Sequence, residues 1–259
     1  PWPGSVAVWS ATDGAGFELN RLVSAPAVIG VTETTLARGP VGLWDRGAPL
    51  RVRLSGGELS SASRDAVLNG ANVLAIGDGS SARWEILQFA EAQLVAPDTY
   101  DLAMRLRGQL GTDGITPETW PVGSTVVLVD LALTQIDLPM SSRGLARHYR
   151  IGPTSRGYED PSVTARIEAF DGIGLRPYPV AHLRASSSQS GDISVTWVRR
   201  TRIDGDNWQS VEVPLGEEAE AYLVRILQGA TIRAEYTVPV PAFDYSAAAR
   251  LQDGVVGAF

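Results

Sequence analysis

Residues 221–238 of this 259-residue chain read AYLVRILQGATIRAEYTV, and apolar side chains occupy every second position in two successive runs. A period of two places alternate side chains on one side of an extended backbone, facing a core. The outward positions carry Leu223 and Arg225 in the first run and mostly charged or hydroxyl side chains in the second. The stretch therefore predicts two half-buried β-strands. Their inward positions are Tyr222, Val224, Ile226, Ile232, Ala234, Tyr236 and Val238.

The same signals recur along the whole chain. Residues 50–54 and 193–197 alternate in the same way, and residues 84–90, 100–106 and 126–131 are rich in β-prone side chains. The run 126–131 is apolar enough to predict a strand buried on both faces. Asp-Gly pairs, typical of tight hairpin turns, begin at residues 13, 78, 113, 171, 204 and 253. We therefore expect a mainly β protein made of antiparallel β-sandwich or barrel modules.

One short helix is expected at residues 61–68, where serines precede a helical run and Asn69-Gly70 provides a stop. Pro177 and Pro179 remove backbone donors and stiffen the chain, which predicts a domain boundary nearby. We assign one or more β-rich domains to residues 1–182 and a final domain to residues 183–259. Two arrangements fit residues 1–182. The first is one large β domain. The second is a framework of residues 1–45 and 131–182 with an inserted domain at 46–130. Both ends of the chain resemble cuts in a longer polypeptide, so we expect the final domain to be truncated at its C-terminus.

The amino-acid composition limits the classes of partner and the chemistry that the chain can have. The formal net charge is −7, and an acidic surface repels phosphate backbones and anionic lipid headgroups, so direct nucleic-acid binding is not expected. The chain contains no cysteine, which excludes disulfides and thiolate chemistry. No run reaches the roughly 18 apolar residues of a spanning helix, so no transmembrane segment is predicted.

Candidate catalytic groups are few and are better explained as structure. The sequence contains no Gly-x-Ser-x-Gly motif, and the two histidines are predicted to lie in loops or linkers, with His182 partly buried where two domains meet. A glycosidase needs two carboxylates at a set separation, but the acids considered are predicted to be solvated on strands or turns. They are Glu85, Asp98, Asp101, Glu168 and Asp171. We therefore predict no catalytic, cofactor-binding or metal-binding residue, no cofactor and no enzymatic activity in this chain.

Candidate binding groups have similar explanations. Residues 204–207 (Asp-Gly-Asp-Asn) resemble part of a calcium loop but are more typical of a hairpin tip. The basic group Arg199, Arg200 and Arg202 is expected on a solvated strand edge that discourages pairing between sheets. Trp84, Trp120 and Trp208 could stack on a sugar ring, although burial is the default for tryptophan.

Residues 183–259 resemble a fibronectin type III module of the kind found in phage tail proteins. Ile193-Ser194-Val195-Thr196-Trp197 is similar to the early strand that carries the core tryptophan. Residues 221–226 are similar to the later strand of the facing sheet, whose tyrosine packs against that tryptophan. The resemblance implies an antiparallel β-sandwich in which Trp197 and Tyr222 pack across the core.

A second resemblance involves residues 106–112, Leu-Arg-Gly-Gln-Leu-Gly-Thr, which are similar to a Leu-Arg-Gly-x-x-Gly-Thr signature of phage tail-tip proteins. With residues 84–89 before it and 175–185 after it, the order resembles the C-terminal part of the large tail-tip or baseplate ("megatron") proteins of gene transfer agents. These are phage-derived particles that move host DNA between cells.

That resemblance implies a structural role in the distal tail of such a particle, made in the bacterial cytoplasm and released extracellularly. The implied partners are copies of the chain in a homotrimer, other tail hub or baseplate proteins, and a glycan on the recipient cell surface. A glycosidase-like domain would lie upstream in the full-length protein. Two alternatives stay open: accessory carbohydrate-binding modules of a secreted glycoside hydrolase, and a bacterial surface adhesin.

Overall fold

The computed structural model describes residues 4–205 and 212–255, and it divides the chain into two units, Pro1–Arg176 and Pro177–Phe259. Strands make up 43% of the structure and helices 8%, which confirms the mainly β prediction. Every named pair of strands is antiparallel. The boundary between the units falls at the first of the two prolines on which the predicted boundary rested.

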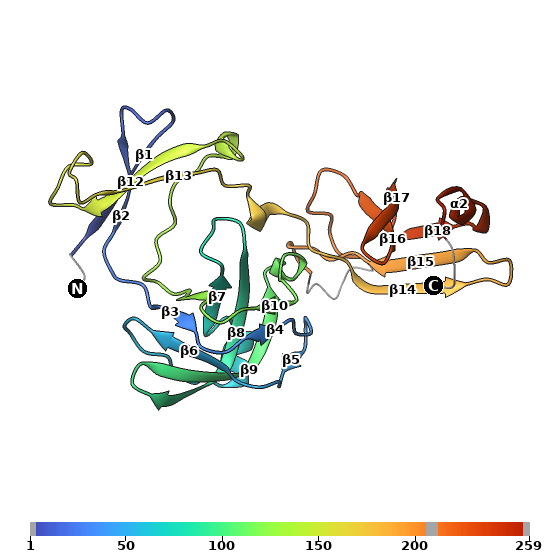
Figure 1. The fold of residues 1–259 in the computed structure, drawn as a ribbon, viewed down its shortest axis with the longest axis horizontal. Helices are drawn as coiled ribbons and strands as arrows, with labels where there is room; N and C mark the ends of the chain where they lie inside the picture. The colour runs from blue at the N-terminus through green and yellow to red at the C-terminus, as the bar shows by residue number, and fades with distance from the viewer. Residues whose placement is uncertain (1–3, 206–211, 256–259) are drawn as a thin grey trace. The chain divides into compact units, whose positions relative to one another are not determined.

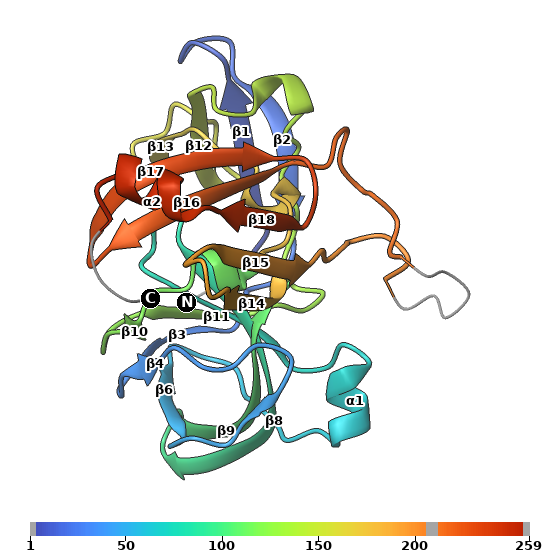
Figure 2. The ribbon, with the colours of Figure 1, turned by 90° about the vertical axis from the view of Figure 1, so that its right-hand side faces the viewer.

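The first unit contains a closed six-stranded barrel (Figures 1 and 2). Around the barrel the strands pair in the order β9-β6-β3-β11-β7-β8, and β8 pairs back onto β9. The strands are β3 (Ile29–Thr32), β6 (Leu50–Leu54), β7 (Val73–Gly77), β8 (Trp84–Ala96), β9 (Thr99–Gln109) and β11 (Thr125–Leu128). The short β5 (Trp44–Asp45) adds to β9, while β4 (Leu36–Ala37) pairs with β10 (Thr119–Trp120).

Alternation along the strands produces the barrel core. In β6 the apolar residues at 50, 52 and 54 are buried, whereas Arg51 and Arg53 face outward and pair with Asp101 and Glu33. The core is built from aliphatic and aromatic side chains that are almost fully shielded from water. Its members are Leu36, Leu50, Val52, Leu54, Leu59, Leu74, Ile76, Leu87, Phe89, Tyr100, Leu102, Trp120 and Val126.

The expected helix is α1 (Arg64–Leu68), in which Ser63 Oγ accepts a hydrogen bond from the Ala66 N–H and Asn69 forms the C-cap. Its buried residue Val67 packs with Ala90 and Leu106 on the barrel wall. The capping serine and the Asn-Gly stop were therefore read correctly, since these residue types supply the bonds that helix ends lack.

A four-stranded sheet in the first unit joins segments that are far apart in the sequence, in the order β13-β12-β1-β2. The strands are β1 (Val6–Ala11), β2 (Glu18–Val23), β12 (Arg147–Pro153) and β13 (Thr164–Glu168). The barrel strands all come from the sequence between β2 and β12. The barrel begins at β3, upstream of residue 46. Strands β3, β4 and β5 are only two to four residues long and show no periodicity in the sequence.

The second unit contains a three-stranded sheet, β14-β15-β18, and a two-stranded sheet, β16-β17. Ile193 and Tyr245 from the first sheet share a core with Ile226 from the second. The strands are β14 (Ala181–Ser187), β15 (Ile193–Val198), β16 (Tyr222–Gln228), β17 (Thr231–Val238) and β18 (Ala242–Tyr245). A second helix, α2 (Ala247–Gln252), was not predicted, although Ser246 caps it and alanines fill its first turn.

Two sequence-based expectations need correction. The strand expected at 126–131 ends at Leu128, and only Val126 in it is buried, while Leu131 is fully exposed. Asp78-Gly79 joins β7 to β8 as a hairpin turn should, but Asp113-Gly114 lies in a 3₁₀-helix and Asp253-Gly254 follows α2. A residue pair that tolerates positive φ serves helix ends as well as hairpins.

The barrel core predicts a clear contrast within one hairpin. Leu102 in β9 is completely buried, whereas Leu94 in β8 is 61% exposed. Leu102→Ala should lower the free energy of unfolding by about 2–5 kcal/mol, since it removes transfer energy and leaves a cavity. Leu94→Ala should change it by no more than about 0.5 kcal/mol. Urea titrations of the two variants measure both effects, and equal losses would contradict the assignment of the core.

Candidate functional site

Glu85 is the most unusual carboxylate in the barrel, because its side chain has no exposure at all. It lies at the same two-residue spacing as the fully buried Leu87 and Phe89 of β8. The prediction that this acid is solvated was therefore wrong. The alternation with Leu87 and Phe89 was the sequence signal that could have placed it inside.

Donors from two other strands satisfy the Glu85 carboxylate. Arg107 binds it in a bidentate way, with Nε 2.7 Å from Oε1 and Nη2 2.9 Å from Oε2. The Gly108 N–H donates to Oε1 at 3.1 Å, and the Trp120 indole N–H donates to Oε2 at 2.7 Å. Charge-assisted bidentate pairing of this kind satisfies both buried charges, which would otherwise be very costly to desolvate.

Arg107 also holds the two short strands at the edge of the barrel. Its Nη1 donates to the Ala37 carbonyl of β4 at 2.8 Å and lies 3.4 Å from Asp45 Oδ2 of β5. Asp45 receives two further bonds from the buried Arg105, at 3.1 Å from Nε and 2.9 Å from Nη2. Arg105 and Arg107 of β9 therefore connect this strand to β4, β5 and β8. Glu85 extends the connection to β10 through its bond with Trp120.

The remaining residues of the Leu-Arg-Gly-x-x-Gly-Thr stretch support the same network. Gly108 has φ +58°, and a Cβ there would lie 2.6 Å from the Asp113 Cβ, so a larger residue would be strained and would clash. Thr112 Oγ1 accepts from the Ile86 N–H at 2.9 Å and donates to the Gln109 carbonyl at 2.8 Å. The stretch thus forms a structural junction between β8 and β9.

The hydrogen bonds and charges around Asp45 act on its ionisation. Burial opposes the charged form, but the Gly47 N–H and the Arg105 guanidinium outweigh that effect and lower the pKa of Asp45 below its usual range. Asp45 is therefore ionised at neutral pH, and the two buried arginines face two carboxylates.

The other sequence candidates lie apart from this network. Asp101 accepts two hydrogen bonds from Arg51, at 2.7 and 2.8 Å, which lower the pKa of Asp101. Asp98 forms the β8–β9 turn with φ +56°, Glu168 ends β13, and Asp171 lies beyond it. The prediction that these acids occupy strands or turns is correct for Asp98, Asp101 and Glu168, whereas Asp171 lies in the irregular segment between β13 and the following 3₁₀-helix.

The two histidines lie on strands and not in loops, His148 in β12 and His182 in β14. His182 is exposed and has φ +52° at a β-bulge, so its predicted partial burial was wrong. Among residues 4–205 and 212–255, no group of three or more His, Asp or Glu side chains is arranged to hold a metal ion. No helix in these residues is long and apolar enough to span a membrane.

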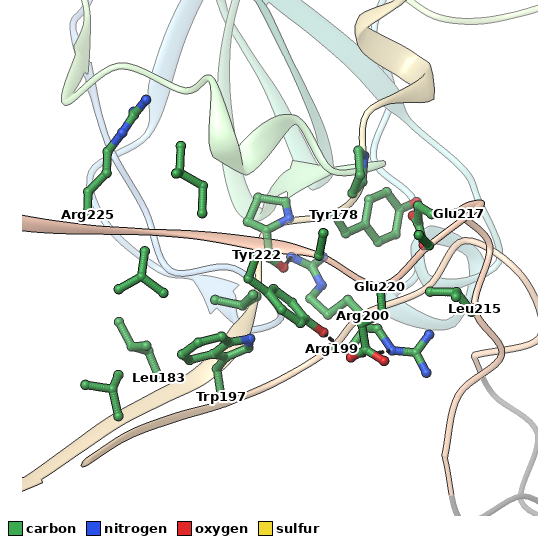
Figure 3. Close-up of a pocket in the computed structure, with 18 of the residues that line it drawn as sticks. Tyr178, Leu183, Trp197, Arg199, Arg200, Leu215, Glu217, Glu220, Tyr222 and Arg225 are labelled. Atoms are coloured by element: carbon green, nitrogen blue, oxygen red, sulfur yellow. Dashed lines mark hydrogen bonds and ion pairs between the residues drawn. The ribbon is translucent and has the colours of Figure 1, made fainter. Parts of the chain in front are cut away.

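The second unit contains an apolar cleft of about 570 Å³ (Figure 3). It is lined by β16, by side chains of β14 and β15, and by residues from segments 177–180, 199–200 and 215–221. A cleft of this volume with mostly apolar walls falls in the range of ligand-binding sites. None of the described residues that line it is a Ser, Thr, Cys or His, so these residues supply no nucleophile–base pair.

Trp197 and Tyr222 lie at the centre of the cleft wall, with ring centroids 5.1 Å apart and planes at 70°. The Tyr222 hydroxyl donates to Glu220 Oε1 at 2.7 Å. Burial and this bond to a carboxylate raise the pKa of Tyr222 to about 12. The contact between Trp197 and Tyr222 is the one that the fibronectin-like resemblance implied.

The arginines expected on a solvated edge instead connect loops around the cleft. Arg199 is mostly buried and donates to the carbonyls of Pro214 at 3.0 Å and Val213 at 2.7 Å. Arg200 and Arg202 lie over the Tyr178 ring, at 5.0 and 4.1 Å from its centroid. The expectation failed because β15 ends at Val198, before the alternation that placed these residues on an edge.

Two of the three tryptophans considered as sugar platforms, Trp84 and Trp120, bond to groups within the first unit. Trp120 is 2% exposed and binds Glu85, and Trp84 is partly buried with its indole N–H bonded to the Ser80 carbonyl at 2.5 Å. Trp208 and residues 206–207 of the acidic turn lie outside the described residues.

Comparison with known families adds one match, located at the barrel. Residues 27–127 match the family model described as Rcc01698-like, C-terminal. The Rcc01698-like segment begins just before β3 and ends within β11, so it holds the strands of the barrel and the Glu85–Arg107 pair. It covers less than half of the chain. No curated protein matches the chain.

The buried pair predicts a large penalty for removing one partner. Arg107→Met should lower the free energy of unfolding by about 3–5 kcal/mol, because it leaves the Glu85 carboxylate buried without its counter-charge. Adding Glu85→Gln to this variant should recover part of the loss, since Gln keeps an acceptor for Trp120 without the charge. Arg51→Met, which breaks an exposed pair, should cost about 1 kcal/mol or less. Denaturant titrations followed by tryptophan fluorescence measure all three, and equal losses for Arg107→Met and Arg51→Met would refute the buried-pair account.

The lowered pKa of Asp45 predicts a pH dependence. The stability that its pairing contributes is present above its unfolded pKa of about 3.9 and is lost as the pH falls through the lower folded pKa. The difference in unfolding free energy between the natural chain and Asp45→Asn should stay constant from about pH 7 to 5 and shrink below about pH 4. Urea unfolding across this range tests it, and a difference that grows on acidification would contradict the sign.

Proposed function

We propose that this chain is a non-enzymatic structural component of the tail tip or baseplate of a phage-like particle, a gene transfer agent. It assembles the distal tail as a homotrimer with other hub proteins and contributes to attachment to the recipient cell surface. The observation that carries the proposal is the match of the barrel to the Rcc01698-like model, a family name associated with gene transfer agents. The tail-tip signature at residues 106–112 lies inside the matched segment.

The physical properties of the barrel support this role. A tail tip works outside the cell under mechanical load, and a closed antiparallel barrel has no free edges within its ring of strands. The Glu85 network adds buried charge-assisted bonds across the strands at the point where the signature lies. A second β module, with a likeness to fibronectin type III domains, offers loops and surfaces for contacts outside the barrel.

The carbohydrate-binding alternative has less support from the same residues. Its motivation was that tryptophans could stack on sugar rings, which requires an exposed ring face. Trp120 is buried in the barrel and Trp84 is engaged through its indole N–H. We therefore place attachment to a cell surface in the loops and the second unit and not on these rings.

The proposal predicts where the protein lies in a particle. An epitope tag inserted between the exposed Ala15 and Gly16, in the loop joining β1 and β2, should be labelled by gold-conjugated antibody at the end of the tail distal to the capsid. Particles from the untagged parent supply the background. Gold on the capsid or neck, or tagged protein present in the lysate but absent from purified particles, would contradict the proposal.

A further inference from the structure

Asn69 is the only asparagine in the chain that is followed by a glycine. Asn69 and Gly70 are both exposed and come directly after helix α1, which lies on the outside of the barrel (Figure 2). In such a pair the backbone nitrogen of the glycine can attack the side-chain amide carbon of the asparagine, because glycine has no side chain that obstructs the approach. The chemistry that this pair offers is therefore spontaneous deamidation, which needs no enzyme and no cofactor.

The folded structure holds the two reacting atoms apart. Asn69 has ψ 16°, which directs the Gly70 nitrogen away from the Asn69 side chain. The Gly70 N–H donates to the Val67 carbonyl at 3.0 Å. The Asn69 Nδ2 donates to the Asp65 carbonyl at 2.8 Å. Attack on the amide therefore requires rotation about the Cα–C bond of Asn69, which breaks the hydrogen bond of Gly70.

These hydrogen bonds belong to the C-terminal cap of α1. Gly70 has φ +96°, and the Ala71 N–H donates to the Ala66 carbonyl at 3.0 Å, so the end of the helix forms a Schellman motif. α1 has five residues, of which only Val67 is buried, and a helix this short is not stable by itself. Opening of α1 as a unit therefore costs less free energy than unfolding of the whole barrel.

We propose that Asn69 is a site of spontaneous deamidation and that the opening of α1 sets its rate. In the open state the Gly70 nitrogen loses its proton and forms a bond to Asn69 Cγ, the Cγ–Nδ2 bond breaks, and ammonia leaves. Water then opens the succinimide ring, which leaves aspartate or isoaspartate at position 69. Overall one water molecule is consumed and one ammonia is released, with no oxidation or reduction. This inference concerns the barrel and does not depend on the proposed function.

The product weakens the helix cap that protects the site. The new carboxylate has no proton to donate to the Asp65 carbonyl, and it lies four residues from the Asp65 carboxylate, a spacing at which like charges on a helix repel. It also adds negative charge at the helix C-terminus, which the helix dipole disfavours. Isoaspartate further adds one carbon to the backbone, so the bonds of the Schellman motif cannot all be kept. Because water does not reverse the loss of ammonia, the converted fraction records the total time that α1 has spent open.

Peptide mapping of the whole 259-residue chain, aged at mildly alkaline pH, tests the proposal. The sequence has no lysine, so trypsin releases residues 65–83 as one peptide that contains both Asn69 and Asn72. Mass spectrometry should show conversion of the amide to an acid at Asn69 but not at Asn72, which valine follows. Conversion should be about tenfold or more slower in native buffer than in urea, because the folded cap must open first. An Asn69→Gln variant, whose longer side chain would need a six-membered ring, supplies the background.

Matched serine substitutions test the role of α1. Ser63→Ala removes the hydrogen bond that Ser63 Oγ accepts from the Ala66 N–H, and it should speed conversion in native buffer about fivefold. Ser24→Ala is the control, because Ser24 is exposed in the segment between β2 and β3. Neither change alters the reacting pair, so both variants should convert at the parent rate in urea.

Three results would overturn the proposal. The first is conversion of Asn69 as fast in native buffer as in urea. The second is Asn69 left unchanged after prolonged incubation in native buffer, with the urea sample fully converted. The third is equal conversion rates for Ser63→Ala and Ser24→Ala in native buffer.

Discussion

The Glu85 carboxylate is held in the barrel wall without any contact with water, and the arrangement of the first unit depends on how its charge is satisfied. Its hydrogen bonds come from Arg107, Gly108 and Trp120, and Arg107 continues to Ala37 and Asp45. A buried pair of this kind adds little net stability compared with an apolar core, but it is very unfavourable when one partner is lost. It therefore favours one strand register and one closure of the barrel over alternatives that would leave a charge unpaired.

The strands of the barrel and those of the second unit are paired in different ways. In the barrel, pairing of β8 with β9 closes the ring, and short added strands are held by buried arginines. In the second unit, β16 pairs with β17 among the described residues and lines an apolar cleft. Closure by strand pairing leaves no free edge within the ring of barrel strands, which is the part of the chain that matches the Rcc01698-like model.

The sequence was most informative where periodicity is long. Strands β6, β15, β16 and β17 follow from alternation, and Ser63 and Asn69 delimit α1 through capping chemistry. The short strands β3 to β5 and β10 carry too little pattern to be found, so the sequence does not show where the barrel begins. The Asp-Gly pairs were ambiguous because positive φ is needed at helix ends as well as in hairpins.

The chemistry of the interior was harder to predict than the fold. Glu85 looked like a solvated acid because charged residues are rarely buried, and only its spacing with Leu87 and Phe89 indicated otherwise. Its partner Arg107 is 22 residues away in the sequence, and no local rule pairs them. The cleft in the second unit could not be predicted from the sequence either, because its position depends on how the strands are arranged in the two sheets. The packing of Trp197 with Tyr222 was anticipated only through the resemblance to fibronectin modules.

The most direct test of the central claim is amide hydrogen exchange in the natural chain, followed by NMR at the Gly108 N–H and the Trp120 indole N–H. Both groups donate to Glu85, so both should exchange only through unfolding of the whole barrel, as slowly as the amides of Leu87 and Leu102. Exchange of these two groups at rates typical of exposed loops, with the strand amides still protected, would show that the Glu85 network does not hold the barrel closed.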